Sequence, residues 1–218
     1  MTDFAVARRM MVDGQIRPYD VTEQNLLAAM LAVPRERLVP PAFGGVAYTD
    51  LDIPLGAGHR CLLKPLVLAR LLQAAAIGPG DRVLDVGCGT GYSAALLARL
   101  AGSVVALEED AALAAQARRA LADVGAGGVT VVEGPLAAGW PAGGPYDVIL
   151  LDGGAEIVPE ELFKQIKDGG RLVGVVGEKP AMRAMLYRSV NGVVGSRPIF
   201  DAVAAPLPGF SKPPAFAF

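Results

Sequence analysis

The sequence contains few residues that could form a metal centre and no long apolar run. Among 218 residues there is one histidine, His59, and there are two cysteines, Cys61 and Cys88. Because metal sites built from Cys and His need several such ligands at short spacings, this composition disfavours a bound metal. No apolar run approaches the roughly 20 residues of a membrane-spanning helix. We therefore expect a soluble protein that holds no metal and does not act at a membrane.

Strong net charge and targeting signals are also lacking. Lys and Arg number 20 against 22 Asp and Glu, so there is no basic excess of the kind that attracts nucleic acid. The first residues include an acid and no apolar core of a signal peptide. With only two cysteines, these features favour a reduced, cytoplasmic setting.

One stretch, residues 83–92, stands out from the rest of the chain. It reads Val-Leu-Asp-Val-Gly-Cys-Gly-Thr-Gly-Tyr, with glycines at positions 87, 89 and 91, and an alanine- and leucine-rich segment follows it. This pattern predicts a buried strand that turns sharply into a helix. Glycines allow positive φ and close approach of a ligand, while the new helix offers free N–H groups.

The glycine spacing favours one cofactor class over another. Dinucleotide-binding folds prefer Gly-x-Gly-x-x-Gly, whereas this chain has Gly-x-Gly-x-Gly. With Asp85 inside the strand, the segment resembles the first motif of the Rossmann-like S-adenosylmethionine methyltransferases. An NAD-binding oxidoreductase is the disfavoured alternative.

Further elements extend the α/β alternation. We expect helices over residues 21–31, capped by Thr22 and ended by Pro34, and over residues 111–122. Strands are expected at 83–86, 103–107, 129–132, 147–151 and 171–176, followed by a hairpin of 185–190 and 193–194 around a type I′ Asn191-Gly192 turn.

These elements predict a Rossmann-like, doubly wound and mostly parallel sheet with an antiparallel C-terminal hairpin. At 218 residues the chain is long enough for one such core and too short for two. We expect an N-terminal helical, wrapping segment over residues 1–65 and the cofactor-binding domain over 66–200. A tail over 201–218 should pack on that domain.

Several short sequence segments resemble, in the same order along the chain, those of the protein-L-isoaspartate O-methyltransferase family. They include Met11-Val12 with Gln15-Ile16, Val33-Pro34-Arg35-Glu36, Ala47-Tyr48 with Asp50, the glycine loop, Pro145-Tyr146-Asp147 and Gly169-Gly170-Arg171-Leu172-Val173. The resemblance covers almost the whole chain. It implies the class I methyltransferase fold, S-adenosylmethionine as cofactor, and methyl esterification of isoaspartyl residues in damaged proteins.

The resemblance also implies a cofactor site at the carboxyl ends of the strands. Its expected members are Asp85, Gly87, Cys88, Gly89, Gly91, Glu108, Gly134, Pro135, Leu136 and Asp152. Glu108 ends the second strand at the distance where a carboxylate meets a ribose. The alternative for Glu108 is the cap or first turn of the following helix.

Three positions depart from the family pattern. The family's active-site serine has no counterpart, because Leu62 or Leu63 occupies its place in the loop before residue 65. Pro135 replaces an aspartate that would contact adenine. Asp152 replaces a threonine; as a possible acceptor-facing charge it suits an amine or hydroxyl and repels a carboxylate.

The clustered departures suggest a divergent member, and the catalytic residue is left unassigned. The acceptor is then an isoaspartyl peptide or protein, or a small molecule that we cannot name. A protein that binds S-adenosylmethionine or its product without turnover is a further alternative. His59 is either a general base or a solvated loop residue. The oligomeric state stays open.

Overall fold

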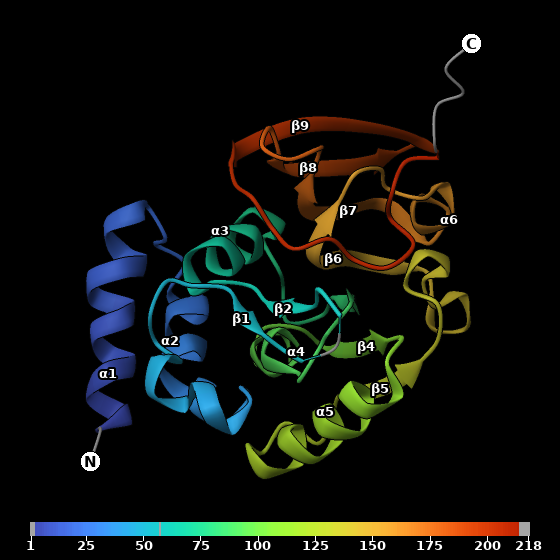
Figure 1. Ribbon diagram of the computed structural model, residues 1–218. Helices are drawn as coiled ribbons and strands as arrows, with labels where there is room; N and C mark the ends of the chain where they lie inside the picture. Colours follow the sequence, from blue (N-terminus) through green and yellow to red (C-terminus); the bar gives the residue numbers. More distant parts are fainter. Residues whose placement is uncertain (1–2, 57, 214–218) are drawn as a thin grey trace.

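A seven-stranded sheet forms the centre of the molecule, whose computed structural model describes residues 3–56 and 58–213 (Figure 1). The strand order is β5-β4-β3-β6-β7-β8-β9. Pairing is parallel from β5 through β7 and antiparallel from β7 to β9, which confirms the predicted fold class. The strands are β3 (Arg82–Val86), β4 (Ser103–Glu108), β5 (Thr130–Glu133), β6 (Tyr146–Ala155), β7 (Ile166–Val176), β8 (Arg183–Val190) and β9 (Val193–Asp201).

Helices cover both faces of this sheet. The α-helices are α1 (Phe4–Met11), α2 (Gln24–Ala32), α3 (Pro65–Ala75), α4 (Tyr92–Leu97), α5 (Ala111–Asp123) and α6 (Glu160–Phe163). Side chains of α1 to α5 join one buried cluster with Val83 and Ala106 of the sheet. Leu84 and Leu107, from the opposite face, join a second cluster with Leu162 of α6. The two-residue alternation along the strands thus divides the core into two layers.

The N-terminal segment packs against the first of these layers. Met11, Ile16 and Met30 belong to the same buried cluster as the sheet. A separate two-stranded sheet, β1 (Ile53–Pro54) with β2 (Cys61–Leu62), lies between this segment and the carboxyl ends of the central strands (Figure 1). The N-terminal segment, which we expected to wrap around the domain, therefore contributes side chains to its core.

Arg35 joins parts of the N-terminal segment to α4. It begins the 3₁₀ turn Arg35–Arg37 and is 0% exposed. Its Nε donates to the carbonyl of Ala47 at 2.8 Å, and its Nη2 donates to that of Leu63 at 2.9 Å. Its guanidinium also lies 4.5 Å from the ring centroid of Tyr92 in α4. One side chain thus fixes three segments.

The C-terminal region forms the predicted hairpin and then crosses the sheet. Asn191 has φ 52° and Gly192 has φ 77°, as a type I′ turn requires. After β9, the chain passes the end of β6, where the N–H of Leu207 donates to the carbonyl of Gly154 at 2.8 Å. Residues 214–218 of the expected tail lie outside the described residues. In the part of the chain that is described, no helix is long and apolar enough to cross a membrane.

One local prediction was wrong, and one strand is longer than predicted. Thr22 does not cap α2: its N–H donates to Gln73 at 2.7 Å, and the side chain of Glu23 caps the helix instead. The strand predicted over 147–151 continues as β6 to Ala155. It continues because Gly154 pairs with the C-terminal segment as well as with β7, a contact that local sequence does not encode.

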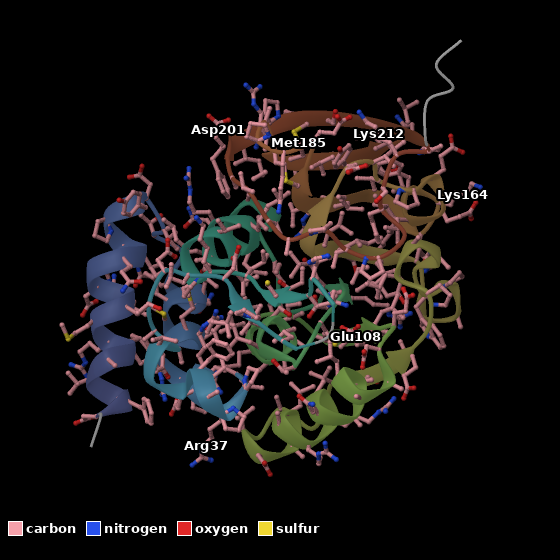
Figure 2. The ribbon with its side chains drawn as sticks, in the orientation of Figure 1. Arg37, Glu108, Lys164, Met185, Asp201 and Lys212 are labelled. Atoms are coloured by element: carbon pink, nitrogen blue, oxygen red, sulfur yellow. The ribbon has the colours of Figure 1, made fainter. Side chains whose placement is uncertain are left out.

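Replacement of Arg35 tests its role as a connector. Arg35→Ala should lower the free energy of unfolding by about 3 kcal/mol, because two buried carbonyls lose their donor and a cavity remains. Arg37→Ala is the matched control, since Arg37 is exposed at the rim of the same turn (Figure 2), and it should cost less than about 0.5 kcal/mol. Urea unfolding of both variants measures this; equal losses would contradict the connector role.

Candidate functional site

The glycine turn lies at the carboxyl end of β3, where the strand order reverses toward β6. Gly87, Gly89 and Gly91 have φ of 83°, 56° and 95°, all in the left-handed region. A Cβ atom on Gly87 would lie 2.8 Å from Leu207, and one on Gly89 would lie 2.6 Å from Leu55. Backbone conformation and space therefore both require glycine, as the sequence predicted.

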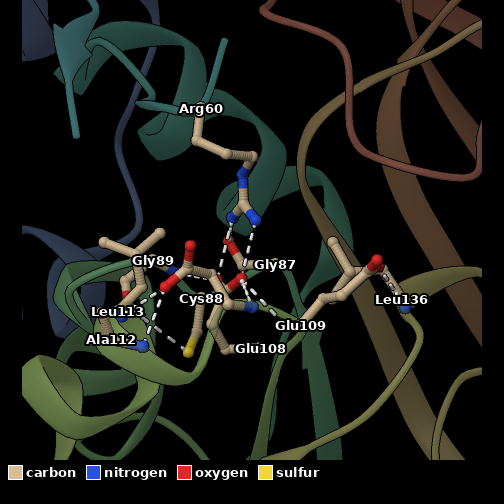
Figure 3. A network of polar contacts seen from close by, with 10 residues as sticks. Arg60, Gly87, Cys88, Gly89, Glu108, Glu109, Ala112, Leu113 and Leu136 are labelled. Carbon is tan, nitrogen blue, oxygen red and sulfur yellow. Dashed lines mark hydrogen bonds and ion pairs between the residues drawn. The ribbon is translucent and has the colours of Figure 1, made fainter. Parts of the chain in front are cut away.

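Glu108 lies beside this turn at the end of β4 and is completely buried. Its carboxylate accepts backbone N–H groups from Gly89 at 2.8 Å, Glu109 at 2.9 Å and Asp110 at 3.1 Å (Figure 3). The side chain of Asp110, rather than that of Glu108, caps α5. The structure thus places Glu108 against the glycine turn, and its predicted contact with a ribose stays a prediction.

Arg60 supplies the remaining partners of Glu108, and sequence reasoning missed it. Its Nη1 and Nη2 donate to the two carboxylate oxygens at 2.7 and 2.9 Å, and Nη2 also donates to the carbonyl of Gly87 at 2.9 Å (Figure 3). Burial opposes its charge, but the hydrogen bonds and charge of Glu108 prevail and raise the pKa of Arg60. No pattern in the sequence indicates a role for Arg60, apart from its place next to His59 in the loop before Pro65.

Two further carboxylates lie in the core beside the turn. The hydroxyl of Ser93 donates to Oδ2 of Asp85 at 2.6 Å, while Oδ1 of Asp85 and Oδ1 of Asp152 have no hydrogen-bond partner. Burial raises the pKa of Asp85 well above its ordinary value, and the charge of Asp152 adds to this. Burial also raises the pKa of Asp152 to about 6. Such a pair favours a cation nearby.

The residues predicted to face the adenine, Gly134 to Leu136, follow β5, the strand that pairs with β4. Gly134 donates its N–H to the carbonyl of Glu108 at 3.2 Å, and Pro135 leads into the short turn Leu136–Ala138. Leu136 is buried, and its N–H donates to the side chain of Glu109 at 3.3 Å. The structure therefore brings together the segments that sequence reasoning assigned to one pocket.

Cys88 belongs to the structure of the turn. Its side chain is fully buried, and burial with the charge of Asp85 raises the pKa of the thiol well above its ordinary value. Close packing, and no reactive thiolate, follows from that environment.

The polar groups of this pocket fit the S-adenosylmethionine implied by the sequence. The unpartnered oxygens of Asp85 and Asp152 suit its cationic end, and the glycines carry no Cβ that would block a ligand at the backbone. Glu108 suits a diol. In the described state, however, the guanidinium of Arg60 and the side chain of Leu207 lie against Gly87. The residues fit the cofactor provided that the side chains of Arg60 and Leu207 turn aside.

An open cleft of about 530 Å³ adjoins this pocket. Its lining, which we call the loop cleft, consists of Pro54, Gly58, His59, Arg60, Cys61, Lys179, Ala205 and Pro206. Three of these side chains are basic and none is acidic. The cleft therefore suits an anionic group.

Neither candidate for the missing serine reaches the loop cleft. Leu62 and Leu63 are each 1% exposed and belong to the main buried cluster. Asp152, 1% exposed, does not line the cleft either, so its predicted contact with an acceptor stays a prediction.

Comparisons with known proteins agree on one family. The family model described as protein-L-isoaspartate(D-aspartate) O-methyltransferase matches residues 8–203. The chain is 40% identical to protein-L-isoaspartate O-methyltransferase 1 of Rhodopseudomonas palustris, over 95% of this chain and 85% of the relative. It is 44% identical to a protein-L-isoaspartate O-methyltransferase of Methanoregula boonei, over 85% of this chain and 84% of the relative.

Solved structures give the same result for the fold. A protein-L-isoaspartate O-methyltransferase structure superposes with TM-score 0.79 at 26% identity, covering 93% of this chain and 66% of that one. A Plasmodium falciparum structure described as a putative enzyme of this name, in complex with S-adenosyl-L-homocysteine, has TM-score 0.78 at 17% identity, covering 95% and 99%.

The buried charge of Asp152 gives a pH-dependent prediction. Asp152→Asn should raise the free energy of unfolding at pH 8 by on the order of 1 kcal/mol, because a desolvated carboxylate is removed. The folded protein binds the proton more tightly than the unfolded chain, so the wild type gains stability as pH falls through about 6. The difference should therefore shrink by pH 5 and vanish near pH 4. Urea unfolding across this range measures it.

Asp201→Asn provides the control, because that side chain is 86% exposed (Figure 2). A gain of Asp152→Asn that did not change with pH would rule out desolvation of the carboxylate as its cause.

Restoring a serine should damage the core. Leu62→Ser should cost about 3 kcal/mol of unfolding free energy, since a buried apolar side chain is lost and a hydroxyl is buried. Leu51→Ser, at a position that is 60% exposed, should change stability by less than about 0.5 kcal/mol. Thermal and urea unfolding compare the two; a neutral Leu62→Ser would mean that this position faces the cleft.

Proposed function

The chain belongs to the protein-L-isoaspartate O-methyltransferase family and is an S-adenosylmethionine-dependent methyltransferase, and we propose that it esterifies the side-chain carboxylate of isoaspartyl residues. The observation that carries this proposal is the left-handed glycine turn next to the buried acid of the neighbouring strand. Esterification turns the carboxylate into a better leaving group, which promotes succinimide closure and hence repair of the damaged peptide.

The residues of the pocket have distinct roles in this proposal. Glu108 accepts both ribose hydroxyls, and the backbone at Gly87 and Gly89 lies along the cofactor. Asp85 and Asp152 balance its cationic end. When bound, the cofactor supplies a methyl group made electrophilic by the adjacent sulfonium.

The chemistry needs positioning more than proton transfer. Because the leaving thioether is neutral, no acid has to protonate it, and the protein has to align the acceptor and exclude water. The segment around Leu207 covers the end of β6 and closes one side of the pocket. This explains why the pocket can function without the family's serine and without a catalytic dyad.

The loop cleft supports a carboxylate acceptor. Arg60 and Lys179 are among its lining residues and no acidic side chain lines it, so the cleft favours a carboxylate over an amine. The alternative acceptor, an amine or hydroxyl held by Asp152, has less support, because that side chain is buried away from the cleft. The partner is thus an isoaspartyl peptide or protein. Our proposal keeps the cytoplasmic setting, with Cys61 and Cys88 as free thiols.

A methyl-transfer assay tests the proposal directly. With labelled S-adenosylmethionine, the protein should methylate an isoaspartyl peptide and leave the aspartyl isomer of the same sequence unlabelled. Calorimetry with S-adenosylhomocysteine checks cofactor binding independently. Binding without transfer to the isoaspartyl peptide would refute the acceptor and favour a protein that binds without turnover.

Glu108 provides the most direct test of the cofactor site. Glu108→Gln should raise the dissociation constant for S-adenosylhomocysteine about tenfold, because an amide has one acceptor oxygen for two hydroxyls. Glu133→Gln is the control, since Glu133 pairs with Glu108 in register on the neighbouring strand and is exposed. Calorimetry should show no change for it; equal affinities in all three proteins would place the ribose elsewhere.

A further inference from the structure

We propose that Arg60 binds the acceptor carboxylate. In the absence of cofactor Arg60 is paired with Glu108, and the ribose of the cofactor displaces it from that carboxylate. The proposal rests on the proposed function, because it gives the cofactor and the isoaspartyl carboxylate their positions. It assigns a substrate-binding residue in a pocket whose family serine is missing.

The ion pair occupies the acceptor positions that a ribose needs. The guanidinium presents two N–H groups to the two oxygens of Glu108, at 2.7 and 2.9 Å. A vicinal diol presents two O–H groups to a carboxylate in the same manner. Arg60 also lies close enough to the glycine turn that a Cβ on Gly87 would be 3.2 Å from Nη2. Arg60 and a ribose therefore compete for one place.

Glu108 can lose Arg60 without losing all of its partners. Its oxygens keep three backbone donors, the N–H groups of Gly89, Glu109 and Asp110. Arg60 is in the opposite position, because after displacement it has no carboxylate partner left in contact. Once displaced, the guanidinium is free to pair with another anion.

The loop cleft is where Arg60 would find that anion. The carbonyl of Arg60 accepts the N–H of Leu55 at 3.0 Å, and the adjacent Cys61 pairs with Pro54, so the backbone is held and only the side chain turns. Arg60 already lines the cleft together with His59 and Lys179. A carboxylate there would accept a bidentate pair from the guanidinium, the geometry for which arginine is suited.

This exchange couples the two ligands. Arg60 becomes available to the acceptor only when it has left Glu108, so S-adenosylhomocysteine should strengthen binding of an isoaspartyl peptide. By linkage, the peptide should strengthen binding of S-adenosylhomocysteine by the same factor. The family serine, a neutral hydroxyl, would show no such dependence on Glu108.

The first test measures S-adenosylhomocysteine binding by calorimetry in the absence of peptide. Arg60→Gln should bind it about tenfold more tightly than the wild type, because the competitor for Glu108 is gone. Arg118→Gln is the matched control, since it breaks an exposed Arg–Glu pair of the same 2.7 Å distance, and its affinity should be unchanged. Unchanged or weaker binding by Arg60→Gln would overturn the proposal that Arg60 and the ribose compete for Glu108. Weaker binding would mean that Arg60 contacts the cofactor itself.

The second test measures peptide binding by fluorescence anisotropy at saturating S-adenosylhomocysteine. The wild type should bind an isoaspartyl peptide about tenfold more tightly than its methyl ester, and more tightly than without S-adenosylhomocysteine. Arg60→Gln should lose both preferences. Their persistence in Arg60→Gln would overturn the acceptor role of Arg60.

Two further arms keep the outcomes distinct. Arg60→Lys keeps the cation but loses the fork, so it should bind S-adenosylhomocysteine more tightly than the wild type and still prefer the carboxylate over the ester; it replaces Arg60→Gln if that variant does not fold. If the wild type binds no isoaspartyl peptide, the proposed function and the acceptor role fail together. The S-adenosylhomocysteine affinities alone still decide whether Arg60 competes for Glu108.

Discussion

A carboxylate buried at the end of β4 constrains the whole functional region. Glu108 has no exposed surface, and a charge in such a place requires a donor for each of its acceptor positions. It obtains them from the glycine turn, from the residues that start the segment leading into α5, and from Arg60 on the loop between β1 and β2. Three segments far apart in the sequence thus meet because one charge must be satisfied.

The remaining buried charges form one electrostatic system with it. Among the residues that the structure describes, the buried charged side chains are Arg35, Arg60, Asp85, Glu108 and Asp152. The arginines stabilise the charge of Asp152, whereas Glu108 opposes it. Because burial raises the pKa values of Asp85 and Asp152, a cation nearby would stabilise their charged forms. In our proposal the sulfonium of S-adenosylmethionine supplies that charge beside the unpartnered oxygens of Asp85 and Asp152.

The departures from the family pattern have different physical consequences. The leucine in place of the serine contributes to the core, so it neither binds nor blocks an acceptor. Pro135 removes an acceptor near the adenine side, yet the N–H of Leu136 remains in the pocket wall and finds Glu109. The loop cleft presents the basic side chains of Arg60 and Lys179, where the family pattern has a serine hydroxyl nearby. Such a site depends on salt and on the state of Glu108 more than a hydroxyl-based site does.

The sequence by itself determined the α/β alternation from β3 to β9, the glycine turn, the I′ hairpin and the acid at the end of β4, although it did not predict α1, α3 or the β1–β2 pair. Each of the predicted features follows from short-range rules: alternating apolar residues, positive φ at glycine, and strand length. The family resemblance added the cofactor and the reaction. Only the tertiary structure decided which side chains meet inside the pocket. Arg60 lies 48 positions from Glu108, and Gly154 pairs with a segment about 50 residues later, so no local pattern could indicate either contact. Nor could the sequence show that Leu62 faces the core and Arg60 lines the cleft, because side-chain directions in a two-residue strand and the loop before it are set by what packs against them.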